Sequence, residues 1–239
     1  MLQMERTLLR SAGTLLLLGT LLVTVPCYGQ EPSQRRAVEQ WQGEMNRFAK
    51  QDQDRLHEDV VFTGSSSVRM WNLEESFGDE FDWLNRGFGG SIINDNIQWM
   101  NQTVLPYTPR VVVLYAGDND IGIGMSVDEV VGDYQKFCDK LHQELPEAKL
   151  VFIAIKPSRA RWNLWPKMKA ANDKIKALTE EADWQYFGDI APPMLGEDGE
   201  PEAELFVDDG LHMTAEGYRR WKGVLQPLIE EALGKASAE

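Results

Sequence analysis

Cysteine is almost absent from this sequence of 239 residues, which contains only Cys27 and Cys138. Cys27 lies in an N-terminal stretch with the pattern of a cleaved leader, so Cys138 would be the only cysteine of the mature chain. A single cysteine excludes an internal disulfide, and the fold must therefore be held together by its hydrophobic core. Cys138 lies in a helical pattern without a catalytic partner nearby, and we expect it to be a small buried apolar side chain.

Positive charge is also in short supply. Lys and Arg number 24 against 38 Asp and Glu, which gives a formal net charge of −14. Residues 1–29 hold Glu5, Arg6 and Arg10, a net charge of +1, so the rest of the chain carries −15. Because phosphate binding needs basic patches, this excess argues against nucleic acids and anionic membrane surfaces as partners. We attribute the negative charge to solubility.

Long apolar runs are limited to residues 15–25. This run is too short for a comfortable membrane span, which needs about 20 apolar residues. Two arginines precede it, and Cys27 and Gly29 supply small residues two apart behind it, which is typical of a signal-peptidase site. We predict a cleaved signal peptide at 1–29 and an exported protein, periplasmic or secreted, with no stable membrane insertion after cleavage. The alternatives are an uncleaved anchor and a lipid anchor on Cys27, which the proline directly before it disfavours.

The remainder of the chain alternates between short apolar runs and helical patterns. The expected strands are 60–63, 81–85, 110–115, 149–155 and 184–187, and the expected helices are 33–57, 68–77, 92–104, 126–145, 165–182 and 214–233. This alternation predicts βαβ units, a parallel sheet and helices on both faces. We therefore expect an α/β fold with three layers, α/β/α, and a five-stranded parallel sheet at 58–235, with an N-terminal helical segment, 30–57, packed on that domain.

Polar and glycine-bearing loops follow the expected strands. They are 65–67, 87–91 and 117–120, and a fourth loop, 208–212, precedes the last helix. In a parallel sheet such loops converge on one edge, so residues far apart in sequence become neighbours there. Serine clusters are also common in turns and at helix N-caps, so the first loop by itself does not indicate catalysis.

Histidine is scarce as well, with only three in the chain. His57 and His142 lie away from these loops, and we interpret both as exposed helix residues. His212 lies three residues after Asp209, where an imidazole can deprotonate a serine while a carboxylate fixes its tautomer. The alternative is that Asp208 and Asp209 only solvate the turn before the last helix.

Together the four loops resemble the ordered sequence blocks of the SGNH hydrolases, the GDSL esterase and lipase superfamily. The first block is Gly64-Ser65-Ser66, the second spans 85–91, the third 117–120 and the last 209–212. The resemblance extends over about 60–233, nearly all of the chain after the leader. Ser65 stands where most members have aspartate, and serine variants resemble a platelet-activating-factor-acetylhydrolase-like branch.

The resemblance implies the flavodoxin-like SGNH hydrolase fold and a role for each matching residue. Ser66 would be the nucleophile, His212 its base, and Asp209 the carboxylate that orients His212. The oxyanion would be met by the backbone N–H groups of Ser66 and Gly90 and by the side-chain amide of Asn119. The mechanism that this implies needs no cofactor and no metal.

The implied activity is that of an exported serine esterase acting on a small ester, such as a carbohydrate O-acetyl ester or a lysophospholipid, through an acyl-serine intermediate. An inactive or weakly active SGNH-fold binding module for acylated glycans is the alternative, and it is disfavoured because every catalytic position is filled. A third alternative is a flavodoxin-like nucleotide or flavin binder. It is disfavoured because this sequence lacks a phosphate-cradling glycine loop with a basic partner.

Arg161 and Trp162 follow an expected strand and so belong to the same edge of the sheet. We consider them candidate substrate-binding residues, because an arginine there can grip an anionic or sugar-like part of a substrate. The alternative is a surface loop in which Trp162 packs as a lid on the core.

Overall fold

The computed structural model describes residues 32–51 and 59–235, so the predicted signal peptide and His57 lie outside the described residues. The sheet is formed by β1 (Val60–Gly64), β2 (Trp83–Gly87), β3 (Val111–Tyr115), β4 (Lys149–Ile153) and β5 (Gln185–Gly188). Every pair is parallel, and the spatial order is β2-β1-β3-β4-β5. The predicted α/β class and the five-stranded parallel sheet are confirmed.

Strand β3 lies at the centre of the sheet with β1 beside it, and every residue in these two strands is buried. Helices cover both faces, which is why these strands are continuous apolar runs rather than alternating patterns. The register places Gly64 beside both Gly87 and Tyr115, at the carboxyl ends of three strands. The loops after β1, β2 and β3 therefore leave the sheet at one edge.

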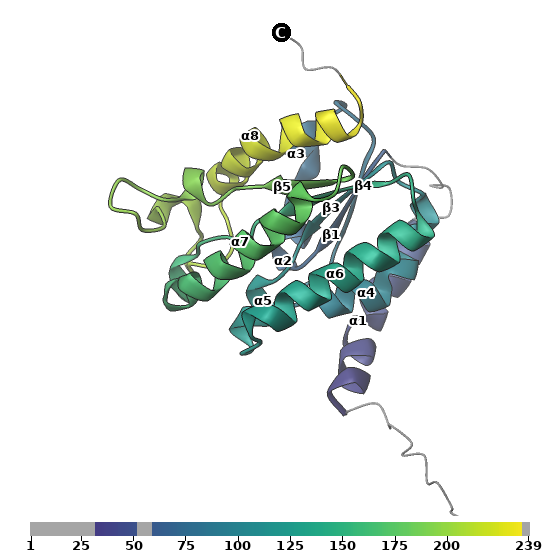
Figure 1. Ribbon diagram of the computed structural model, residues 1–239, viewed down its shortest axis with the longest axis horizontal. Helices are drawn as coiled ribbons and strands as arrows, with labels where there is room; N and C mark the ends of the chain where they lie inside the picture. The colour runs from purple at the N-terminus through teal and green to yellow at the C-terminus, as the bar shows by residue number, and fades with distance from the viewer. Residues whose placement is uncertain (1–31, 52–58, 236–239) are drawn as a thin grey trace, which may run out of the picture.

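The helices form two layers around the sheet (Figure 1). On one face lie α2 (Ser66–Arg69), α3 (Leu73–Phe77) and α8 (Ala215–Ala232), and on the other lie α4 (Ile93–Thr103), α6 (Val127–Glu144) and α7 (Trp165–Glu180). Successive strand residues face opposite layers, so Phe62 joins the cluster of Trp221 whereas Val61 joins that of Phe137. The expected three-layer arrangement is present.

Helix α1 (Pro32–Gln51) packs beside α4, and residues 52–57 of the expected helix 33–57 lie outside the described residues. Its apolar side chains form a small cluster with residues of the second loop and of α4: Trp41, Met45, Phe48, Phe88 and Trp99. The indole N–H of Trp41 donates to the carbonyl of Gly89 at 2.9 Å. The helix therefore supports the loop that carries Gly90.

The prediction of one continuous helix at 68–77 is wrong. Helix α2 ends at Arg69 and α3 begins at Leu73, because Asn72 caps the second helix by accepting from the backbone N–H of Glu75 at 3.2 Å. The loop expected at 117–120 also differs, since a short helix, α5 (Asp118–Gly122), begins inside it.

The predicted burial of Cys138 is confirmed. Side chains cap two further helices: Ser126 and Glu129 form a capping box at the start of α6, and the Thr214 side chain caps α8. Short 3-10 turns complete the connections: η1 (Leu105–Tyr107), η2 (Arg159–Leu164), η3 (Pro192–Met194) and η4 (Ala203–Leu205).

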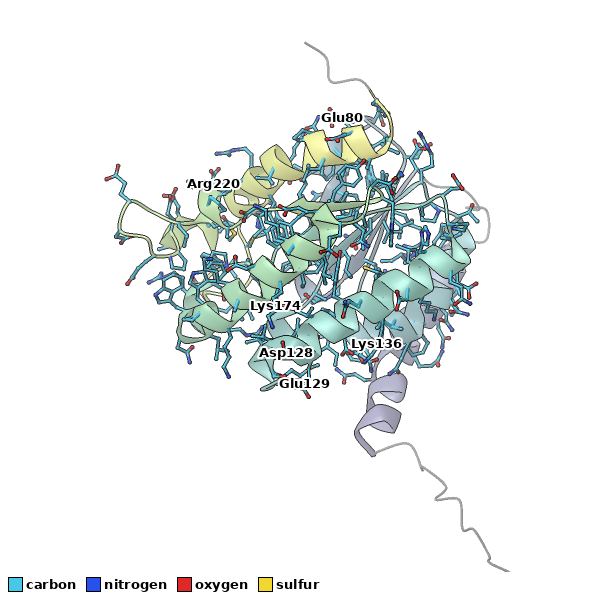
Figure 2. The ribbon with its side chains drawn as sticks, viewed as in Figure 1. Glu80, Asp128, Glu129, Lys136, Lys174 and Arg220 are labelled. Atoms are coloured by element: carbon cyan, nitrogen blue, oxygen red, sulfur yellow. The ribbon has the colours of Figure 1, made fainter. Side chains whose placement is uncertain are left out.

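Ion pairs on the surface join elements that are distant in sequence. Lys174 of α7 pairs with Asp128 of α6 at 2.6 Å (Figure 2). Arg220 of α8 pairs with Glu202 at 2.8 Å. Arg220 also donates to the carbonyl of Pro193 at 2.7 Å, so the segment before the fourth loop is fastened to α8. Within 32–51 and 59–235, no helix has the length and apolar character of a membrane span.

Candidate active site

Ser66 is the first residue of α2, directly after the end of β1 and its N-cap Ser65. The three neighbouring serines differ in their surroundings. Ser65 and Ser67 are buried, whereas Ser66 is partly exposed. The Ser67 hydroxyl accepts a hydrogen bond from the Lys156 ammonium at 3.0 Å and is therefore occupied inside the protein. Of the three hydroxyls, that of Ser66 is the one open to a substrate.

His212 and Asp209 lie next to the Ser66 hydroxyl. The Nε2 atom of His212 is 2.8 Å from Ser66 Oγ, and its Nδ1 atom is 2.6 Å from Asp209 Oδ2. The other carboxylate oxygen of Asp209 accepts from the backbone N–H groups of Leu211 and His212, each at 2.8 Å. Desolvation alone would raise the pKa of Asp209, but these hydrogen bonds with His212 and Leu211 outweigh it and lower the pKa to about 2.

The loop that carries His212 is fixed at several points. The backbone N–H of Val207 donates to the carbonyl of His212 at 2.9 Å, and the N–H of Ala160 donates to the carbonyl of Gly210 at 3.0 Å. From α8, the Tyr218 hydroxyl donates to the carbonyl of Ser67 at 2.8 Å and so ties the last helix to the turn that carries Ser66. These contacts set the approach of the imidazole to the hydroxyl.

Two glycines let the backbone pass where a side chain would collide. Gly64 has φ +135°, and a Cβ atom there would lie 2.0 Å from the carbonyl oxygen of Tyr115. A Cβ at Gly87 would lie 2.3 Å from the backbone nitrogen of Arg69, at the end of α2. Gly64 thus lets the end of β1 lie close to Tyr115 of β3, and Gly87 lets α2 lie against the end of β2.

Gly90 occupies the second loop in the left-handed region, with φ +78°. A Cβ atom built there would meet nothing within 4 Å, so the residue borders open space. Asn119, near the start of α5, reaches the same loop, because its amide nitrogen donates to the carbonyl of Ser91 at 3.0 Å. The structure therefore brings the second and third loops together beside the turn that carries Ser66.

Arg161 does not stand free at the edge of the sheet. Its Nη2 atom donates to the amide oxygen of Asn119 at 3.0 Å, and its Nη1 atom lies 3.3 Å from Asp118 Oδ2. Trp162 stacks on Trp165, with ring centroids 6.1 Å apart, and is partly exposed. The two candidate substrate-binding residues thus have different surroundings, and Arg161 contacts a predicted oxyanion residue.

The sequence reasoning missed Lys156, which is completely buried behind the Ser66 turn. Its ammonium donates to Ser67 Oγ at 3.0 Å, to the Tyr115 hydroxyl at 2.9 Å and to Asp118 Oδ2 at 3.0 Å. Burial lowers the pKa of Lys156, and Asp118 partly offsets this effect. Burial would raise the pKa of Asp118, but Lys156 and Arg161 hold it below its usual range. A lysine directly after an apolar strand was the available signal.

Asp120 is buried and serves the fold rather than the open edge. Its Oδ1 atom accepts from the backbone N–H of Ile93 at 3.0 Å, at the first residue of α4. Burial raises the pKa of Asp120 to about 7, against the opposing effect of the Ile93 hydrogen bond. This side chain joins the third loop to the helix that follows the second.

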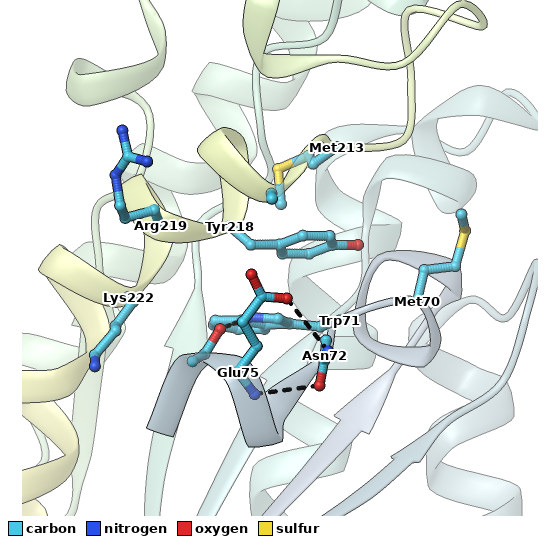
Figure 3. A pocket seen from close by; sticks show the side chains of 10 residues that line it. Met70, Trp71, Asn72, Glu75, Met213, Tyr218, Arg219 and Lys222 are labelled. Atoms are coloured by element: carbon cyan, nitrogen blue, oxygen red, sulfur yellow. Dashed lines mark hydrogen bonds between the residues drawn. The ribbon is translucent and has the colours of Figure 1, made fainter. Parts of the chain in front are cut away.

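Two hollows are lined by residues that belong to the site or lie close to it in the chain. One, of about 420 Å³, lies between α3 and the start of α8 and includes Met70, which follows α2, and Met213, which follows His212 (Figure 3). Within it, Trp71 and Tyr218 stack with centroids 5.4 Å apart. The other hollow, of about 550 Å³, is lined in part by Asp209. Among the described residues, no group of three or more His, Cys, Asp or Glu side chains is placed to hold a metal ion.

Comparison with known proteins identifies the family. The model of the GDSL-like Lipase/Acylhydrolase family matches residues 63–220, more than half of the chain. A comparison with curated proteins gave no match.

Solved structures are similar in fold. A Streptococcus pneumonia protein provisionally named as a platelet activating factor has a TM-score of 0.72 and 18% identity, over 83% of this chain and 99% of its own. A GDSL-like lipase from Bacteroides thetaiotaomicron has a TM-score of 0.69 and 21% identity, over 79% of this chain and 98% of its own. A carbohydrate esterase of family 3 from Talaromyces cellulolyticus has a TM-score of 0.59 and 18% identity, over 74% of this chain and 99% of its own. The chain has the SGNH hydrolase fold and belongs to the GDSL-like lipase/acylhydrolase family, as a hydrolase of ester bonds.

Proposed function

We propose that this protein is an exported serine esterase in which Ser66 attacks the ester carbonyl and forms an acyl-serine intermediate. The observation that carries the proposal is the continuous hydrogen-bonded series from Ser66 Oγ through His212 to Asp209, with contacts of 2.8 and 2.6 Å. A serine hydroxyl is a weak nucleophile at its ordinary pKa, and an adjacent imidazole activates it by accepting the proton during attack.

The roles of the remaining groups follow from the chemistry of the attack. Asp209 stays ionised above about pH 2 and stabilises the imidazolium that forms on His212. The tetrahedral oxyanion accepts hydrogen bonds from the backbone N–H groups of Ser66 and Gly90 and from the side-chain N–H of Asn119. His212 then protonates the departing alcohol, and water hydrolyses the acyl-serine with the same histidine as its base.

For the substrate, we propose a small carboxylic ester, either a carbohydrate O-acetyl ester or a lysophospholipid. The hollow between Met70 and Met213 lies next to the proposed machinery in the chain and combines apolar and polar side chains, which suits either class. Similarity of fold to a carbohydrate esterase supports the first class. We further propose export, which rests on the leader pattern of residues 1–29.

The test uses two serine variants that differ by one position. Ser66→Ala is expected to lose at least about 10⁴-fold in kcat on a short-chain aryl ester, as removal of a nucleophile does in serine hydrolases. Ser67→Ala is the matched control and should lose far less turnover than Ser66→Ala, because its hydroxyl is buried against Lys156 and does not face a substrate. Full activity in Ser66→Ala would refute the assignment.

A substrate panel then separates the classes. Purified protein lacking residues 1–29 would be assayed on acetylated sugars, lysophospholipids and acyl thioesters. Turnover on one ester class identifies the substrate, whereas binding of acylated glycans without turnover of any ester would favour the binding-module alternative.

A further inference from the structure

Arg161 contacts the side chain that the proposed mechanism uses as an oxyanion donor. Its guanidinium donates to the Asn119 amide oxygen at 3.0 Å, while the Asn119 amide nitrogen donates to the carbonyl of Ser91, also at 3.0 Å. An asparagine amide has two N–H donors on one nitrogen and can be turned by half a rotation about its last bond. With its oxygen and one N–H both engaged, Asn119 is fixed in one orientation and has a single N–H left to offer.

The guanidinium is itself held in place. Asp118 Oδ2 lies 3.3 Å from Arg161 Nη1 and 3.0 Å from Lys156 Nζ, so one buried carboxylate serves two cations. Gly122 leaves room for the group, since a Cβ atom there would come within 3.1 Å of the guanidinium carbon of Arg161. The Arg161 side chain is 22% exposed, which leaves little of it facing solvent.

The same charged residues also contact the turn that carries Ser66, on its buried side. Lys156 joins Asp118 to the hydroxyl of Ser67, the residue directly after Ser66. A continuous set of contacts therefore runs from the turn that carries Ser66 to the amide of Asn119. Contacts of this kind hold two parts of a site in a fixed relation without touching the substrate.

From these contacts we infer that Arg161 is a positioning residue that orients and polarises the Asn119 amide for the oxyanion. A cation on the amide oxygen draws electron density from the nitrogen and strengthens the remaining N–H as a donor. That donor matters most when negative charge develops on the carbonyl oxygen, so its loss lowers kcat rather than substrate affinity. This role replaces substrate binding for Arg161, and it rests on the proposed function of Asn119.

A double-mutant cycle tests the inference. On a short-chain aryl ester, Arg161→Ala is expected to lower kcat by about 10- to 100-fold with KM nearly unchanged, less than the loss of about 10² to 10³ expected for Asn119→Ala. In the Asn119→Ala background, Arg161→Ala should change kcat less than about twofold, because its target is gone. Arg110→Ala is the control, an arginine at the opposite end of β3, and should leave kcat unchanged.

A second variant guards against loss of fold. Arg161→Lys keeps a positive charge beside Asp118 but lacks the planar fork that reaches Asn119 as well, so it should fold and still lower kcat. An unchanged kcat in Arg161→Lys, a rise in KM alone, or a full Arg161→Ala effect in the Asn119→Ala background would overturn the inference. The proposed function is tested separately by the turnover of Ser66→Ala, which does not depend on the outcome for the Arg161 variants.

Discussion

The Nε2 atom of His212 lies 2.8 Å from the hydroxyl of Ser66, although the two residues are 146 positions apart in the chain. Each residue lies on a short segment, one anchored by the end of a strand and the other by the start of a helix. Ser66 opens α2 directly after β1, and His212 precedes α8. Because α8 is tied to the Ser66 turn by Tyr218, the contact depends on the packing of the last helix on the sheet.

Asp209→Asn should separate the two functions of this side chain. An asparagine oxygen can still accept from the backbone N–H groups of Leu211 and His212, so the turn should persist. Its amide nitrogen would face His212 Nδ1 and favour the wrong tautomer, which we expect to lower kcat by about 10³ to 10⁴ with little change in Tm. Steady-state kinetics and thermal unfolding measure both; a variant with full turnover would exclude Asp209 from the mechanism.

Ser65→Ala should be nearly neutral. The Ser65 hydroxyl is buried without a hydrogen-bond partner among the described protein atoms, and it makes no cap to α2. Removing an unsatisfied buried hydroxyl is expected to change the free energy of unfolding by less than about 1 kcal/mol and to leave kcat unchanged. Denaturant unfolding and the ester assay check this, and a large loss of turnover would mean that the departure from the family aspartate has a role in catalysis.

Asp120→Asn should change how stability depends on pH. The folded pKa of Asp120 is raised to about 7 from 3.8, so between pH 4 and 7 the folded state keeps a proton that the unfolded state releases. This group therefore lowers stability as pH rises through that window, by at most about 1.4 kcal/mol per pH unit. Asparagine retains the acceptor for the Ile93 N–H and does not ionise.

The measurement is thermal unfolding of both proteins from pH 4 to 8. The advantage of Asp120→Asn over the parent chain should grow from pH 4 to 7 and then level off. Asp95, whose pKa burial raises to about 6, contributes in the same direction in both proteins and cancels in the comparison. A constant difference across the range would contradict the expectation.

Met70→Trp should test whether the hollow of about 420 Å³ receives part of the substrate. Met70 is 45% exposed and lines this hollow one turn after Ser66. A larger side chain should raise KM several-fold for a bulky ester and leave a small acetate ester unaffected, since filling a pocket excludes only what entered it. Gln135→Trp is the control, because it fills a hollow on α6 away from the site. If the KM of Met70→Trp for the bulky ester equals that of the parent chain, the hollow does not receive the substrate.

The sequence by itself determined the fold class and the order of the functional loops. Continuous apolar runs such as Val111–Tyr115 indicate strands that are buried on both faces, and their alternation with helices requires a parallel sheet. The carboxyl ends of such strands meet at one edge, which is why the loops 65–67, 87–91 and 117–120 could be grouped. The resemblance to the SGNH hydrolases then selected Ser66, Gly90 and Asn119 within them. The capping box of Ser126 and Glu129 is likewise a local feature, because its two residues lie only three positions apart in the chain.

Only the tertiary structure decided how each of these side chains is used. Three adjacent serines are alike in sequence, but burial and the ammonium of Lys156 occupy Ser67 and leave Ser66 open. Arg161 was one of two candidates for substrate binding, and its contact with Asn119, 42 positions away, appears only in the folded chain. Such pairings arise from packing between elements, and no local pattern encodes them. Burial and long-range contact set the environment of a polar group, and both exist only once the chain has folded.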